Sequence, residues 1–158
     1  MKPLRRKAAG FSLVELMAVL AVMAVLAVVA MPLAEVSWQR ERERELKRAL
    51  WEIRDAIDAH KRAADVGLIE KVADGYPPSL NALVAGVPSR GAGAGERRYF
   101  LRRLPRDPFA PDGVTAEKTW GLRSMASPPE RPVPGADVYD VHSQSTATGL
   151  NGVPLRAW

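Results

Sequence analysis

The sequence predicts an α+β protein in which one long N-terminal helix packs on a small antiparallel sheet. Three observations lead to this fold class. An uncharged apolar segment runs from Leu16 to Ala34, a stretch with helical periodicity follows it, and only short strand candidates come later, at 119–122, 137–142 and 153–156. Helical and strand patterns that are segregated along a chain, rather than alternating, are typical of α+β domains.

Composition narrows the functional classes. The chain of 158 residues has a formal net charge of +5, but the first ten residues contain four basic residues and no acid, which leaves +1 for the remainder. A charge confined to one end provides no broad basic surface, so no nucleic-acid partner is expected. The chain has no cysteine, which excludes disulfides and thiolate metal sites. We find no catalytic triad order, phosphate loop or zinc motif, and therefore expect no enzymatic activity.

The segment from Leu16 to Ala34 is long enough to cross a membrane. Its 19 residues span about 28 Å as a helix, close to the ~30 Å of a bilayer core. The basic residues before it favour a cytoplasmic start and an outward crossing. Three interpretations fit so far: a cleaved secretory signal with a small-residue site at Val28-Val29-Ala30, an uncleaved anchor, and a precursor that is cut before the apolar run.

Glu15 distinguishes these interpretations. It is the one charge between Phe11 and Ala34, and an ordinary signal or anchor has no use for a carboxylate there. An acid inside a membrane is costly and points to a function with a specific partner. Cleavage after Gly10 would give Phe11 a free amine four residues before Glu15. That amine can pair with the carboxylate within one chain or between neighbouring chains, and the pair can then set the stagger of an assembly.

The run Gly10-Phe11-Ser12-Leu13-Val14-Glu15 resembles the prepilin peptidase signature of type IV pilins and type II secretion pseudopilins. The resemblance implies that the leader 1–10 is removed after Gly10 on the cytoplasmic side. It also implies that Phe11 is N-methylated and that Glu15 is the assembly glutamate. Pro32 matches a helix-breaking proline of the same family. Because proline lacks an N–H and clashes with the preceding turn, we expect a kink there.

The family resemblance also implies a place and partners. We expect a single-pass protein of the bacterial inner membrane with a cytoplasmic N-terminus, a transmembrane and assembly helix at 11–36, and a periplasmic domain at 37–158. Its partners would be membrane lipid, prepilin peptidase, an inner-membrane assembly platform, minor pseudopilins and copies of itself in a filament. A minor pilin of a type IV pilus or DNA-uptake machine would share this N-terminus and stays as the alternative.

The stretch after the apolar segment predicts the domain half of the helix. Leu46, Leu50, Ile53 and Ile57 are spaced four, three and four residues apart, which places them on one face that should pack on the sheet. Gly67 is a natural stop, so we expect the helix to run from Phe11 to about Ala64. A membrane half joined to a domain half in one helix is the pilin-like architecture.

The remainder predicts short elements. Ser79 should cap a short helix over 79–84, and the glycine-rich stretch 86–95 is expected to be a mobile loop. The segment Leu104-Pro105-Arg106-Asp107-Pro108-Phe109 resembles the Leu-Pro-x-Asp-Pro-aromatic segment of G-type major pseudopilins. Together with the retained acid at Glu15, it favours the major secretion subunit over the alternative.

Calcium is the one cofactor that the resemblance suggests. G-type major pseudopilins carry a calcium site near their C-terminal strands, built from Asp and Ser side chains and carbonyls. In the comparable region here, Asp140 and Ser143 would be the ligands, although the family's later acidic continuation is missing. Since calcium takes six to eight oxygens, the other interpretation is that both are strand residues without a metal.

Overall fold

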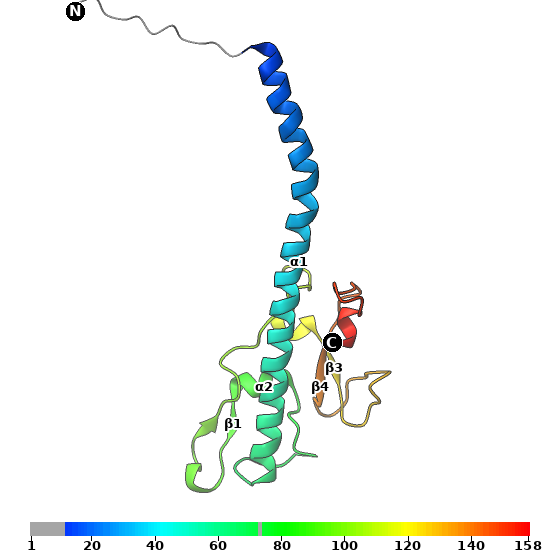
Figure 1. Ribbon diagram of the computed structural model, residues 1–158. Helices are drawn as coiled ribbons and strands as arrows, with labels where there is room; N and C mark the ends of the chain where they lie inside the picture. Colours follow the sequence, from blue (N-terminus) through cyan, green and yellow to red (C-terminus); the bar gives the residue numbers. More distant parts are fainter. Residues whose placement is uncertain (1–11, 73) are drawn as a thin grey trace, which may run out of the picture. The chain divides into compact units, whose positions relative to one another are not determined.

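The computed structural model describes residues 12–72 and 74–158, and the chain divides into two compact units, Met1–Gln39 and Arg40–Trp158. One helix, α1, spans Leu13–Asp65 (Figure 1). It ends as the sequence predicts: Gly67 adopts a φ of +76°, and the N–H groups of Gly67 and Leu68 donate to the carbonyls of Ala64 and Ala63. These bonds satisfy two of the carbonyls that a helix end leaves open. The predicted start at Phe11 lies outside the described residues.

Between Leu16 and Ala34, α1 contains only uncharged apolar residues. Among the described residues, α1 is the one helix long and apolar enough to cross a membrane. Its helical run continues over Pro32 without a break, and the kink expected there stays a prediction.

The core of the second unit forms on one face of α1. The predicted stripe of Leu46, Leu50, Ile53 and Ile57 is confirmed, because each of these side chains is at most 2 % exposed. They pack with buried apolar side chains from the short second helix, from two later strands and from the C-terminal segment. These include Leu80, Leu83, Trp120, Val141 and Leu155. Burial of such side chains is worth about 1.5–3 kcal/mol each, so this face of α1 organises the domain.

The short helix α2, Leu80–Ala85, begins and ends on sequence signals. Ser79 caps it as predicted, and its hydroxyl accepts a hydrogen bond of 3.3 Å from the N–H of Ala82. Gly86 follows with a φ of +74°, and a Cβ on it would approach the Tyr99 ring to 2.9 Å. Position 86 therefore requires glycine for both its backbone conformation and its space.

Two small antiparallel sheets complete the α+β arrangement. β1, Val87–Pro88, pairs with β2, Arg97–Arg98. β3, Trp120–Arg123, pairs with β4, Asp140–Ser143, in the register Trp120 to Ser143. The predicted fold class, a long helix packed on small antiparallel sheets, is thereby confirmed.

Two local expectations were wrong, and two predicted strands are present with shifted bounds. The stretch 86–95, expected to be a loop, contains β1 and a short 3-10 helix at Gly91–Gly93. The strand expected at 153–156 is reduced to a single antiparallel bridge between Pro154 and Thr148, and a 3-10 helix at Leu155–Ala157 follows it with Leu155 buried in the core. The strands expected at 119–122 and 137–142 begin later, at Trp120 and Asp140.

Candidate functional sites

Glu15 lies in the first turn of α1, surrounded by apolar side chains. It is the acidic residue of that turn, and the neighbouring Val14 and Leu16 are largely exposed. The hydrogen bond from the Leu16 N–H to the Ser12 carbonyl, 3.1 Å, shows that the turn is already formed there. The N–H groups at a helix start carry partial positive charge, which favours a carboxylate at this position. Gly10 and Phe11, the predicted processing residues, lie outside the described residues.

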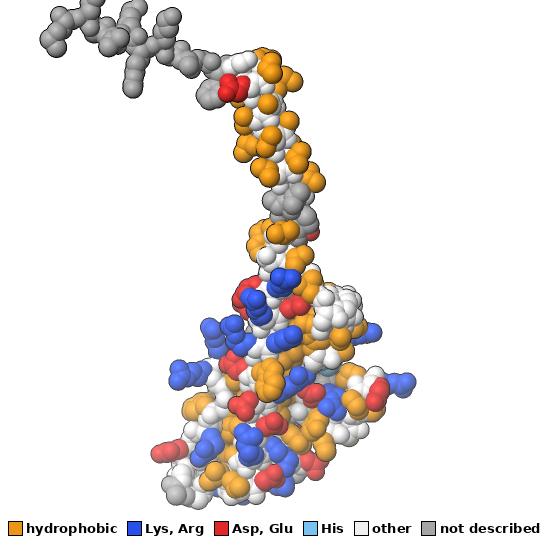
Figure 2. All heavy atoms as spheres, in the orientation of Figure 1, with side chains coloured by type: hydrophobic (Ala, Val, Ile, Leu, Met, Phe, Trp, Pro, Cys, Tyr) orange, Lys and Arg blue, Asp and Glu red, His pale blue; other side chains and the backbone are white. Residues whose placement is uncertain are grey.

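The apolar surface of α1 has no cover within the described part of the chain. In the most apolar window of 18 residues, no residue is buried. Figure 2 shows hydrophobic side chains covering this stretch of the helix. Monomeric soluble proteins rarely expose apolar patches of more than a few hundred Å². A surface of this kind requires lipid or other protein chains around it.

The segment 104–109 is tied to the second sheet through a buried carboxylate. Asp107 is 1 % exposed. One of its oxygens accepts a hydrogen bond of 2.7 Å from the Phe109 N–H, and the other accepts one of 2.6 Å from the Ser143 hydroxyl. The indole N–H of Trp120 donates to the Pro105 carbonyl at 2.9 Å. The sequence predicted a proline turn here but not the burial of Asp107. The available signal was that an Asp side chain often accepts a hydrogen bond from the backbone N–H two residues later, as Asp107 does from Phe109.

Asp140 is held by two arginines. The Arg54 Nε donates to one carboxylate oxygen at 2.8 Å, and an Arg123 Nη lies 3.4 Å from the other. Arg54 also donates to the carbonyls of Val141, at 3.0 Å, and Trp158, at 2.8 Å. This one guanidinium therefore joins α1 to β4 and to the end of the described chain.

The structure does not bring Asp140 and Ser143 together as metal ligands. Their side chains lie on opposite faces of β4, because they are three residues apart in a strand. Asp140 already faces two guanidinium groups, and the Ser143 hydroxyl donates to Asp107. No group of three or more His, Asp or Glu residues in the described ranges is placed to hold a metal ion. As they lie, the two predicted ligands do not fit a calcium site.

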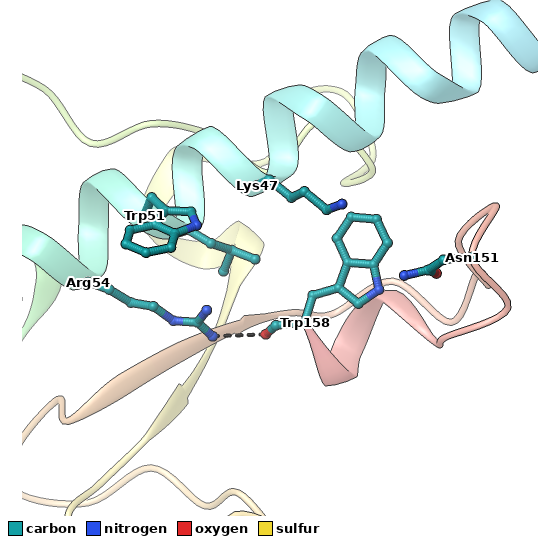
Figure 3. A pocket seen from close by; sticks show the side chains of 6 residues that line it. Lys47, Trp51, Arg54, Asn151 and Trp158 are labelled. Atoms are coloured by element: carbon teal, nitrogen blue, oxygen red, sulfur yellow. Dashed lines mark hydrogen bonds between the residues drawn. The ribbon is translucent and has the colours of Figure 1, made fainter.

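A hollow of about 250 Å³ opens beside α1 (Figure 3). Its lining includes Lys47, Trp51, Arg54, Asn151 and Trp158. The Lys47 ammonium lies 4.6 Å from the centre of the Trp158 ring, within the range of a cation–π contact. Trp51 is 76 % exposed, unusual for so large an apolar side chain. Sequence reasoning did not single out Trp51, because periodicity shows only that it lies off the core stripe.

His60 is a buried part of the domain core. Its Nδ1 lies 3.0 Å from the Gly75 carbonyl, which can only accept, so this nitrogen carries the proton. The imidazole also packs against the Phe100 ring at 5.1 Å between centroids. Burial lowers the pKa of His60 below its usual value, although the bond to Gly75 acts in the opposite direction. The neutral ring is therefore the form that the fold accommodates.

Comparison with known proteins identifies the N-terminal segment. Residues 5–31 match the family described as the prokaryotic N-terminal methylation motif. This range contains Gly10, Phe11 and Glu15. No curated protein and no solved structure matches the chain.

Proposed function

We propose that this type IV pilin-like protein is a structural subunit of the pseudopilus of a type II secretion system. The observation that carries the proposal is the uncovered apolar stretch of α1 up to Ala34, with Glu15 as its one acid, under an N-terminal methylation motif. The motif belongs to structural proteins that are not enzymes. Such proteins are processed by prepilin peptidase and assemble into filaments.

The chemistry of assembly follows from the charge in the apolar segment. Before assembly, the subunit is anchored in the inner membrane. Its helix crosses the bilayer, its basic leader lies on the cytoplasmic side, and its domain lies in the periplasm. Removal of residues 1–10 creates an amine at Phe11. In a low-dielectric surrounding, that amine and the Glu15 carboxylate attract strongly and reduce each other's desolvation cost. Pairing between subunits then defines one relative position of neighbouring helices.

The segment 104–109 supports a secretion subunit over other pilin-like proteins. Its Asp107 is part of the domain interior, bonded to the Ser143 hydroxyl at 2.6 Å, and not a surface turn. The sequence Leu-Pro-x-Asp-Pro-aromatic thus has a defined structural role in this domain. A minor pilin of a type IV pilus or DNA-uptake machine is the second candidate, since it shares the N-terminus. The copy number of the protein in isolated filaments separates a major from a minor subunit.

Replacing Glu15 tests the filament role. Glu15→Leu removes one intramembrane charge, so insertion is unimpaired or improved. We expect normal cleavage and normal membrane abundance, but no filaments on overexpression and a secretion defect. Glu15→Asp should be intermediate, because the charge stays while its reach shortens. Met17→Leu, an apolar exchange in the same stretch, is the matched control and should behave as wild type. Filaments and secretion at wild-type levels with Glu15→Leu would refute the proposal.

A further inference from the structure

The outer face of the sheet formed by β3 and β4 carries charged side chains. In the register of this sheet, Arg123 lies opposite Asp140, and Gly121 lies opposite His142. Val141, between Asp140 and His142 in β4, belongs to the hydrophobic core. Because successive side chains of a strand point to opposite faces, Asp140 and His142 lie on the face that is turned away from the core. Arg123 lies on that same face, opposite Asp140.

A hollow of about 160 Å³ opens on this face. Pro129 and Pro132 of the loop between β3 and β4 line it, and so does Arg156 of the C-terminal 3-10 helix, which packs beside β4 (Figure 1). Pockets that bury drug-sized molecules measure about 300–1,000 Å³, so this space suits a small ion. We call it the arginine hollow. Its charged and imidazole side chains are Arg54, Arg123, Arg156, Asp140 and His142.

Positive charge is in excess in the arginine hollow. Three guanidinium groups line it, and Asp140 provides the one carboxylate of the lining. The two oxygens of that carboxylate face Arg54 at 2.8 Å and Arg123 at 3.4 Å. One carboxylate cannot balance three arginines, and guanidinium groups form their strongest hydrogen bonds with anionic oxygens. The charge of the lining therefore favours an anion as the ligand.

Two of the three arginines keep unused hydrogen-bond donors. Arg156 forms no hydrogen bond or ion pair with any residue that the structure describes. Arg123 reaches the Asp140 carboxylate and the Ser127 carbonyl at 3.4 Å each, longer than an ordinary N–H···O bond. Its guanidinium also lies over the Tyr139 ring, which leaves the N–H groups at its edge available. Only 17 % of the Arg123 side chain is exposed, so water satisfies few of these donors.

His142 adds an acceptor to the arginine hollow. Its Nδ1 lies 3.0 Å from the Ser143 carbonyl, which can only accept, so this nitrogen carries the proton. In the neutral ring, Nε2 is then an acceptor, and it has no partner among the described residues. Gly121 provides the space for this ring, because a Cβ at position 121 would overlap the imidazole. The arginine hollow thus combines anion-binding donors with an acceptor for a proton on the ligand.

We propose that the arginine hollow binds a phosphate group that keeps at least one P–OH, as inorganic phosphate does at neutral pH. Arg123 and Arg156 donate to the charged oxygens of the phosphate, and the P–OH donates to His142 Nε2. Sulfate has the same tetrahedral shape but no proton at neutral pH. It would leave His142 Nε2 unpaired and would place full negative charge against Asp140. The arginine hollow should therefore prefer phosphate to sulfate.

Calorimetric titration of the full chain in detergent measures this preference, in a buffer that contains neither anion. Phosphate should bind at one site per chain. Sulfate should bind at least about tenfold more weakly, because an acceptor left unpaired costs the free energy of one hydrogen bond. No binding of phosphate, or equal affinities for the two anions, would overturn the proposal.

Glycerol 3-phosphate distinguishes the two sources of a phosphate group, the free ion and a phosphate monoester such as a lipid headgroup. It keeps a P–OH but attaches a glycerol to the phosphorus. If it displaces inorganic phosphate, the arginine hollow accepts a headgroup of this kind. If it does not, the ligand is the free ion. Both results support the phosphate site and identify its source.

Arg156→Gln tests the donors of the site. Since Arg156 has no partner among the described residues, the change should leave thermal unfolding without phosphate unaltered. The phosphate affinity should fall by roughly tenfold to hundredfold, the effect of losing one charge-assisted hydrogen bond. Arg102→Gln, the same change at an exposed arginine outside the arginine hollow, is the matched control and should keep the wild-type affinity. An equal affinity of both variants for phosphate would contradict the site.

His142→Ala tests the acceptor. The variant should bind phosphate more weakly and sulfate as before, so that the preference for phosphate decreases. A merely structural role of His142 would lower both affinities together, and that result would overturn the assignment of Nε2 as the acceptor. None of these measurements depends on filament assembly, so the phosphate site and the proposed function are tested separately.

Discussion

Arg54 is predicted to be the most important charged side chain for the stability of the unit Arg40–Trp158. It donates to the Asp140 carboxylate at 2.8 Å and to the carbonyls of Val141 and Trp158 at 3.0 and 2.8 Å. Leu at this position keeps an aliphatic stem against the core but removes all three bonds. The change therefore tests the polar contacts more than the packing.

The expected loss follows from these contacts. Hydrogen bonds that involve a charged group contribute about 1.5–3 kcal/mol each when buried. The side chains of Arg54 and Asp140 are 37 % and 28 % exposed, so solvent screening reduces each contribution. Asp140 also keeps Arg123 at 3.4 Å. We expect Arg54→Leu to lower the free energy of unfolding by about 2–3 kcal/mol, and Arg54→Lys by less, since an ammonium cannot reproduce the fork of a guanidinium.

Urea unfolding of the full chain in detergent, followed by tryptophan fluorescence, to which the buried Trp120 contributes, measures this loss. Arg90→Leu is the control: Arg90 forms a surface pair with Glu70 at 3.2 Å, and its loss should cost a few tenths of a kcal/mol at most. A loss below about 0.5 kcal/mol for Arg54→Leu, equal to that of the control, would refute the role given to Arg54.

Two further predictions concern pH and calcium. Burial lowers the pKa of His60 in the folded chain. Below about pH 6.5 the unfolded chain therefore binds a proton at this residue more readily than the folded chain, which favours unfolding. The urea concentration at the unfolding midpoint should therefore decrease as the pH is lowered from about 7.5 to about 5.5, and His60→Gln should make that decrease smaller. An equal decrease in both proteins would contradict this prediction. Because Asp140 is held by two arginines and the Ser143 hydroxyl faces Asp107, neither calcium nor a chelator should change the melting temperature. A rise with calcium would show that these ligands rearrange around the ion.

Local signals in the sequence predicted the helical part of the fold. The stop of α1 at Gly67, the cap of α2 at Ser79 and the buried face from Leu46 to Ile57 each depend on residues near in sequence. Backbone geometry and helical periodicity are enough to locate them. The charge and apolar pattern around Glu15 likewise identified the segment that matches the methylation motif.

Features that depend on distant residues could not be predicted in the same way. β1 and β2 contain two residues each, and their pairing is set by how the chain returns past Gly86, not by a strand pattern. The hydrogen-bond partners of the predicted ligands were out of reach of sequence reasoning for a similar reason. Asp140 and Ser143 looked like a ligand pair because they are close in sequence, but their partners, Arg54 and Asp107, come from positions far from them. A single sequence shows neither contact.

The mature N-terminus is the most direct test of the central claim, that the chain is a processed filament subunit. Intact-mass and peptide mass spectrometry of the protein from bacterial membranes should find a chain that begins at N-methylated Phe11. Gly10→Val should leave the precursor uncut, because a larger side chain crowds the cleavage site. A mature chain that begins at Met31 would identify an ordinary secretory signal, and an uncut wild-type chain would identify a plain membrane anchor. Either result would contradict this account.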